Sequence, residues 1–96
     1  MTVTITIAFN AAEGKRDELI EAMTGVIPDT MAFDGCQRIQ FVESTQEPGS
    51  LLLIEDWESL EHYARYKEWR AESATSVLGT GLVGGSPVTN TFEPLI

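Results

Sequence analysis

The sequence predicts an α+β protein in which an antiparallel sheet is covered by helices on one face. Apolar and polar residues alternate in the segments expected to be strands, so one side of each strand is apolar. In two longer segments the apolar residues recur at helical spacing. The segments follow one another in the order β-α-β-β-α-β, and we expect residues 1–96 to form a single domain.

The first strand is expected from Thr2 to Phe9, where alternate apolar side chains share one face: Val3, Ile5, Ile7 and Phe9. After Gly14, apolar residues at helical spacing predict the first helix: Leu19, Ile20, Met23, Val26 and Ile27. Pro28 is expected to break or tighten this helix near its end, because proline lacks the N–H that a helix interior uses. A turn is expected at Asp34 and Gly35.

The second and third strands are expected at Cys36–Ser44 and Leu51–Trp57, joined by a turn at residues 46–49. One face of the second strand carries Ile39 and Phe41, and the other carries Arg38, Gln40 and Val42. The third strand is apolar at nearly every position, which indicates burial on both faces. We therefore expect it to be a central strand or to lie beneath a dimer contact.

The second helix is expected to begin after Ser59, whose hydroxyl can cap the first turn. One face of this helix is expected to meet the sheet, with His62 and Trp69 on its flank. That face consists of Leu60, Tyr63, Ala64, Tyr66, Arg70 and Ala74. Residues 78–87 hold four of the eight glycines and are predicted to be a loop, and the last strand is expected at Val88–Phe92.

This order of elements is the split-βαβ, ferredoxin-like arrangement, whose helices lie on one face of the sheet. The other face must then meet water or a second copy of the chain. Val42 and either Leu52 or Leu53 are expected on that face. A chain this short buries only about 60–65% of the surface that its unfolded form exposes, so a partner would help it. We therefore expect a homodimer.

The charge and the cysteine count exclude several classes of protein. With a net charge of -9 and no basic stripe, nucleic acid is not expected as a partner, and anionic membrane surfaces are disfavoured. No apolar run approaches the roughly 20 residues that span a bilayer, and the alternating start is unlike a signal peptide. The lone Cys36 excludes an internal disulfide and suits the reducing cytoplasm. A single histidine, without CxxC or HxxxH pairing, predicts no metal site.

Three segments, taken in order, resemble the antibiotic biosynthesis monooxygenase family: AEGKRDEL at residues 12–19, PDTMAFDGC at residues 28–36 and IEDWESLEHY at residues 54–63. The most specific piece is the junction of the third strand and the second helix, Glu55–Ser59, and the resemblance covers about residues 3–70. It implies a homodimer whose two sheets form an α+β barrel, with a pocket between sheet and helices in each protomer. For characterised members it implies oxygenation of phenolic or quinol-like polyketides without metal or flavin. Other similar proteins degrade haem or isomerise small phosphorylated sugars, so the fold does not fix the chemistry.

The chain departs from the family pattern at several polar positions. The haem-degrading branch carries a ligand histidine late in the second helix, at the position that is Ser76 here, so haem binding is not expected. Many members carry a histidine where this chain has Tyr66, and oxygenating members use an asparagine where it has Ala8 or Leu53. Trp57 and Tyr63 match residues that line the pocket in oxygenating relatives.

Four side chains are candidate catalytic residues: Trp57, Tyr63, Tyr66 and His62. Trp57 either walls a pocket and orients an aromatic substrate through its N–H, or caps the core. The two tyrosines face the sheet, where a hydroxyl can hold a phenolate or simply lie at the rim of a packed face. His62 is a candidate general base, because histidine is the side chain most often used for this role, although a histidine on a helix flank is more often a surface residue.

The candidate substrate-binding residues are Phe9, Asn10, Phe41 and Arg70. Arg70 lies in line with Tyr63 and either pairs with an acidic neighbour or stabilises an anionic intermediate. Asn10 is a turn residue or a catalytic amide. Phe9 and Phe41 form either the apolar floor of a pocket or plain core.

Together these residues predict a cofactor-free monooxygenase that acts on a small aromatic molecule, with molecular oxygen as co-substrate. The site must bury the ring, exclude water and hold the substrate as an anion. Two other functions stay open: an isomerase or cyclase acting on a similar ring compound, and a non-catalytic dimer that binds a small molecule. Oxygen uptake separates the oxygenase from the isomerase, and a pocket without a polar group near its centre would favour the binding protein.

Overall fold

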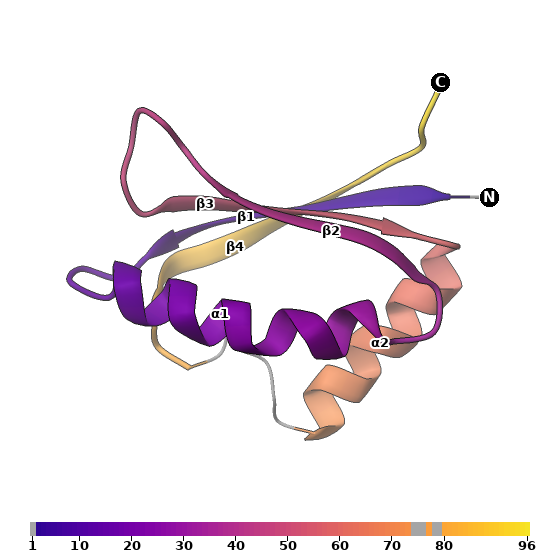
Figure 1. The fold of residues 1–96 in the computed structure, drawn as a ribbon, viewed down its shortest axis with the longest axis horizontal. Coiled ribbons are helices and arrows are strands. Elements are labelled where there is room, and N and C mark those ends of the chain that lie inside the picture. The colour runs from indigo at the N-terminus through magenta and orange to yellow at the C-terminus, as the bar shows by residue number, and fades with distance from the viewer. Residues whose placement is uncertain (1, 74–76, 78–79) are drawn as a thin grey trace.

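Six elements follow one another in the predicted order in the computed structural model of the chain, which describes residues 2–73, 77 and 80–96 (Figure 1). They are β1 (Val3–Ala11), α1 (Arg16–Met31), β2 (Cys36–Glu43), β3 (Ser50–Trp57), α2 (Leu60–Ser73) and β4 (Val83–Phe92). The strands form one antiparallel sheet in the order β2-β3-β1-β4. The predicted ferredoxin-like α+β fold and the central position of the third strand are therefore confirmed.

Both helices lie on the same side of the sheet (Figure 1), and the strand register decides which side chains face them. In β3 every second residue is buried, and Leu51, Leu53, Glu55 and Trp57 lie on this inner face. Ile5 and Ile39 flank Glu55, and Ile7 and Phe41 flank Leu53. Trp57, Ile5 and Leu19 are fully buried, and burial of side chains of this size stabilises the fold by about 1.5–3 kcal/mol each.

The sequence predicted that Pro28 breaks or tightens α1 near its end. The helix does not break there but ends three residues later, at Met31, and a tight turn follows in which the Phe33 N–H donates to the Thr30 carbonyl oxygen at 3.1 Å. A proline inside a helix costs about 3 kcal/mol or more, because it removes one N–H donor and its ring crowds the preceding turn. Pro28 still contributes to the last turn of α1, because its carbonyl oxygen accepts the Ala32 N–H at 3.1 Å. Thr30, in this last turn, is 3% exposed and faces α2.

The strand β4 begins at Val83, five residues before the start that the sequence predicted at Val88. Gly84, which favoured a loop in the sequence, pairs with Asn10 across an irregularity in the β1–β4 register. A bulge of this kind accommodates glycine, and an edge strand tolerates Pro87 because its N–H side can face away from the ladder. Turn residues therefore do not exclude pairing at this edge of the sheet.

The helix α2 is capped as predicted, because the His62 N–H donates to the Ser59 hydroxyl oxygen at 3.2 Å. Its buried face is rotated from the predicted one. Tyr63 and Arg70 are buried and Tyr66 is half-buried, whereas Leu60 is 52% exposed and Ala64 is exposed too. The two exposed residues lie to one side of the stripe that the larger side chains form at helical spacing. Ala74, the last residue of the predicted face, lies outside the described residues.

The outer face of the sheet carries a patch of apolar side chains with no helix over it (Figure 1). We call it the outer patch: Val42, Leu52, Ile54, Val88 and Phe92. Leu53, the alternative to Leu52 for this face, points inward and is 5% exposed. Arg38, beside the patch, donates to Asp56 of its own chain at 3.0 Å. Within the described residues, neither helix has the length and apolarity to cross a membrane.

Candidate active site

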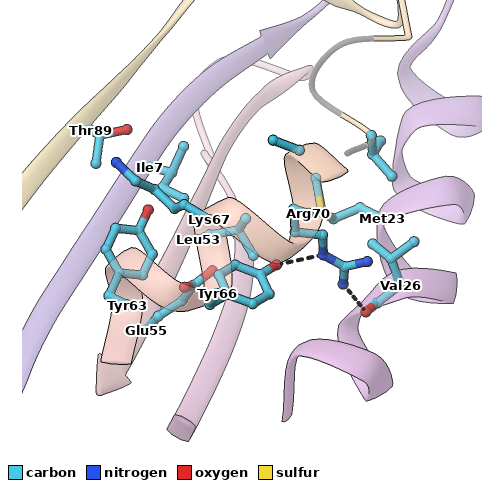
Figure 2. A pocket seen from close by; sticks show the side chains of 12 residues that line it. Ile7, Met23, Val26, Leu53, Glu55, Tyr63, Tyr66, Lys67, Arg70 and Thr89 are labelled. Carbon is cyan, nitrogen blue, oxygen red and sulfur yellow. Dashed lines mark hydrogen bonds between the residues drawn. The ribbon is translucent and has the colours of Figure 1, made fainter. Parts of the chain in front are cut away.

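A cavity of about 290 Å³ lies between the inner face of the sheet and the two helices (Figure 2). Its volume is at the lower end of the range for small-molecule sites, which is about 300–1,000 Å³. Apolar side chains from the strands, from α1 and from the segment after α2 form much of the wall: Ile7, Leu53, Met23, Val26 and Val77. A cavity with such walls suits a small aromatic or aliphatic ligand.

The polar side chains that line the cavity come mainly from β3 and α2: Glu55, Tyr63, Tyr66, Lys67, Arg70 and Thr89. The α2 residues recur at three- and four-residue spacing, which places them on one side of the helix. Three of them, Tyr63, Tyr66 and Arg70, are site residues that the sequence predicted. Lys67, Thr89 and Glu55 were not among the predicted site residues.

Glu55 is a carboxylate on the inner face of the sheet and is only 3% exposed. The Trp57 indole N–H donates to Glu55 Oε1 at 2.9 Å. Burial raises the pKa of Glu55, while the Trp57 hydrogen bond and the positive charge of Arg70 act in the opposite direction. The strand pattern contained the signal for this residue, because Glu55 alternates in step with Leu53 and Trp57 and must share their face.

Tyr66 and Arg70 belong to a hydrogen-bond network that joins α2 to the last turns of α1. The Tyr66 hydroxyl forms a hydrogen bond with the Thr30 hydroxyl at 2.8 Å, in which either group can donate, and it accepts from Arg70 Nε at 2.9 Å. Arg70 Nη2 donates to the Val26 carbonyl oxygen at 2.9 Å (Figure 2). The same nitrogen donates to Thr30 Oγ1 at 2.7 Å. Arg70 is 6% exposed, so its charge is fixed in place at the cavity wall.

Tyr63 also lines the cavity, but its hydroxyl makes no hydrogen bond to any residue that the structure describes. Burial raises the pKa of Tyr63, so its hydroxyl keeps its proton and remains a donor at neutral pH. The Lys67 ammonium lies 5.3 Å from the centre of the Tyr63 ring and extends towards Thr89 of β4 (Figure 2). The centre of the Trp57 ring lies 5.6 Å from the centre of the Tyr63 ring and 5.0 Å from the centre of the Tyr66 ring.

The other predicted site residues lie outside the set that lines this cavity. His62 contacts the Ser59 hydroxyl through Nδ1 at 2.7 Å and Glu58 through Nε2 at 3.0 Å, at the start of α2. Phe9 is 3% exposed in the core and stacks on Phe41, with 6.3 Å between the centres of the two rings. Asn10 is exposed near the end of β1. Trp57 does not line the cavity but contacts three residues that do, Glu55, Tyr63 and Tyr66. The roles predicted for these residues in the reaction remain predictions.

No cluster of three or more histidine, cysteine or acidic side chains that could hold a metal is present in the part of the chain that the structure describes. Cys36 is partly buried, and burial raises the pKa of its thiol to about 11, so it is protonated at neutral pH. Ser76, at the position of the haem ligand in the haem-degrading branch, lies outside the described residues.

The fold and the cavity define a small α+β protein that can enclose a ligand between one sheet and two helices. The sequence model of one family, antibiotic biosynthesis monooxygenase, matches residues 2–74. The chain belongs to this family. No curated protein matches it.

Solved structures share the fold at low sequence identity. The protein SO0527 from Shewanella oneidensis is 24% identical, with a TM-score of 0.77 over 95% of this chain and 88% of its own. Rv0793 from Mycobacterium tuberculosis is 22% identical, with a TM-score of 0.77 over 100% of this chain and 97% of its own. A variant of SnoaB, a cofactor-independent oxygenase from Streptomyces nogalater, is 14% identical, with a TM-score of 0.84 over 99% and 94%. At these identities the likeness is one of fold.

Proposed function

We propose that the protein is a cofactor-independent monooxygenase that oxidises a small phenolic, quinol or polyketide-type molecule. The observation that carries this proposal is the cavity, an enclosure of aromatic and aliphatic side chains with Glu55, Tyr63 and Arg70 at its wall. Such a site can bury a ring, exclude water and stabilise an oxygen anion. Membership of the family and a fold shared with a cofactor-independent oxygenase support the same class of reaction.

The reaction we propose begins with ionisation of the phenol. The phenolate gives one electron to dioxygen, and the two radicals combine at a ring carbon that carries hydrogen. Loss of water from the resulting hydroperoxide leaves a quinone, so one oxygen atom enters the product and the other leaves as water. The protein holds the ring, keeps water out and stabilises the anion, and the Tyr63 hydroxyl is placed to donate to it.

We also propose that the working form is a homodimer that carries no resident metal or flavin. The outer patch is half-buried or exposed in the single chain, with Val88 55% and Phe92 53% exposed. Pairing of two such faces would remove the apolar side chains from water. The lone cysteine is consistent with a reducing cytoplasm as the place of action.

An isomerase or cyclase acting on a similar ring compound is the second candidate, and Glu55 is the observation that favours it. A buried carboxylate inside the cavity can move a proton without any oxygen chemistry. A purely binding function is less favoured, because polar groups lie within the cavity.

Oxygen uptake and isotope labelling test the proposal. We expect the protein to consume dioxygen with 1-naphthol or anthrone, and to place one ¹⁸O atom from ¹⁸O₂ in the product and one in water. Product formed without oxygen uptake would favour the isomerase. Absence of turnover with either substrate, at rates above the buffer reaction, would contradict the monooxygenase for this class of small phenols.

A cavity-filling pair of variants ties the activity to the site. Val26 lines the cavity from α1, so Val26→Trp should fill it and lower kcat/KM at least about tenfold. Thr24 lies on the exposed side of the same helix, and Thr24→Trp introduces the same side chain outside the cavity. Equal activity of the two folded variants would mean that the reaction takes place elsewhere.

A further inference from the structure

We propose that Glu55 is the proton acceptor of this site, and that the ligand is a phenol or enol held as its anion between Tyr63, Lys67 and Arg70. The inference deepens the proposed function and rests on the same cavity. It also gives the proton of the ionising phenol an acceptor, which the proposed function left unnamed.

One oxygen of the Glu55 carboxylate is open to a ligand. Oε1 accepts the Trp57 N–H, which fixes the orientation of the carboxyl group. Oε2 accepts no hydrogen bond from any residue that the structure describes. No fully enclosed side-chain oxygen or nitrogen among those residues lacks a partner, so Oε2 is not fully enclosed. Because Glu55 is 3% exposed and lines the cavity, the cavity is the place from which Oε2 can be reached.

Glu55 lies among mostly uncharged side chains, and its burial makes the protonated form of the carboxyl more favourable than it is in water. Its neighbours across the strands are uncharged, Ile5 on β1 and Ile39 on β2. The titratable or charged groups that face it are Cys36 on β2 and Tyr63, Tyr66, Lys67 and Arg70 on α2. On α1 and β4 the cavity is lined by uncharged side chains, Met23, Val26 and Thr89. A general base works best when its pKa lies near the working pH, and burial moves that of Glu55 in this direction.

The proton transfer leaves the negative charge where cations can stabilise it. The ligand O–H bond breaks, the proton moves to Glu55 Oε2, and the electron pair stays on the ligand oxygen. Lys67 and Arg70 both line the cavity, and they are two of only six basic residues in a chain of net charge -9. Tyr63 keeps its proton and can donate to the same oxygen. The cavity is thus positive in an otherwise acidic protein, which favours an anionic ligand.

The first test follows the Trp57 indole N–H by NMR in the ligand-free protein, from about pH 3 to pH 9, a range that begins below the usual glutamate pKa. Because this group donates to Glu55, its resonance should titrate with a midpoint above the usual glutamate pKa of about 4.3. The transition should vanish in Glu55→Gln, in which an amide oxygen still accepts the N–H. It should persist in Glu61→Gln, an exposed glutamate on α2. A flat wild-type signal, or a transition that survives in Glu55→Gln, overturns the proposal.

The second test uses kcat/KM against pH with 1-naphthol. Glu55→Gln should lower kcat/KM by about 10²–10⁴ and remove its acid limb, while Glu61→Gln should change neither. Lys67→Met should lower kcat/KM without moving the limb, whereas Lys15→Met, on the exposed start of α1, should have no effect. Equal kcat/KM values for the two lysine variants would overturn the proposal that Lys67 holds the ligand anion.

The two tests separate this inference from the proposed function. Titration of Glu55 in a protein that never consumes oxygen would leave the proton acceptor standing and remove the oxygenase. If the protein consumes oxygen and Glu55→Gln leaves the rate unchanged, the oxygenase stands and Glu55 is not the proton acceptor.

Discussion

The two tyrosines of α2 differ in what their hydroxyl groups do. Removal of the Tyr66 hydroxyl should lower stability, whereas removal of the Tyr63 hydroxyl should lower activity. Tyr66→Phe removes one hydrogen bond from the charged Arg70 and one shared with Thr30. A bond to a charged group contributes about 1.5–3 kcal/mol and a neutral one about 0.5–1.5 kcal/mol. Because the site is partly open to water, we use the lower half of the two ranges combined and expect the free energy of unfolding to fall by about 2–3 kcal/mol.

Tyr63→Phe removes a hydroxyl that makes no hydrogen bond to a described residue. We expect it to change the free energy of unfolding by less than about 1 kcal/mol. If this hydroxyl donates to the substrate anion, however, kcat should fall by about 10²–10³.

Thermal unfolding checks the first effect, because for a domain of this size 1 kcal/mol corresponds to roughly 4–8 °C in Tm. Tyr66→Phe should therefore lower Tm by roughly 10–20 °C, and Tyr63→Phe by only a few degrees. Oxygen uptake with 1-naphthol, measured below both transitions, checks the second effect. Equal Tm values for the two variants, or a larger loss in Tyr63→Phe, would refute the reasoning.

Four further predictions follow from the fold and the site. Burial raises the pKa of Glu55 above its unfolded value, so the ionised carboxyl lowers folding stability as pH rises from about 4.3 through the folded pKa. Glu55→Gln removes this loss and should raise Tm more at pH 8 than at pH 5, whereas an equal shift in Tm at both pH values would contradict the reasoning. Gly35 has φ +93° and a Cβ there would lie 2.5 Å from His62, so Gly35→Ala should lower Tm more than an alanine substitution at the unstrained, open Gly25 of α1 does. Light scattering should give about twice 10.6 kDa for the wild type and 10.6 kDa for Leu52→Arg, with a wild-type monomer at micromolar concentration as the contrary result. The purified protein should show neither a Soret nor a flavin band and no stoichiometric metal.

Strand alternation predicted most of the fold because each strand buries one face. The inward and outward sides of β1 and β2 follow directly from it, whereas β3 is apolar at nearly every position, so its sequence left Leu52 and Leu53 as alternatives for the outer face. The errors occurred where tertiary packing overrides local preference. Pairing with β1 draws the glycines of β4 into the sheet, and α2 leaves Leu60 exposed although its tyrosines face inward as predicted.

The candidate site was predictable where it lies on one helix and not where it depends on contacts between elements. Tyr63, Tyr66 and Arg70 share a helical face, so spacing alone found them. Thr30 joins them only because α1 continues beside α2, which no local pattern indicates. Glu55 could have been found by treating it as an inward residue of its strand. His62 contacts Ser59 and Glu58, three and four residues before it, so helical spacing could have indicated these contacts.

The continuation of α1 past Pro28 has a consequence for how a ligand reaches the cavity. The turns that hold Val26 and Thr30 bind the Arg70 guanidinium, so the two helices are fastened to each other at that end. Separating them would break several hydrogen bonds of a buried cation at once, which makes this end a slow route for a ligand. On the other side, Lys67 is exposed and lies near Thr89 of the edge strand β4 (Figure 2). We therefore expect a molecule to arrive and depart past the lysine, with the rate of exchange set by the motion of one flexible side chain.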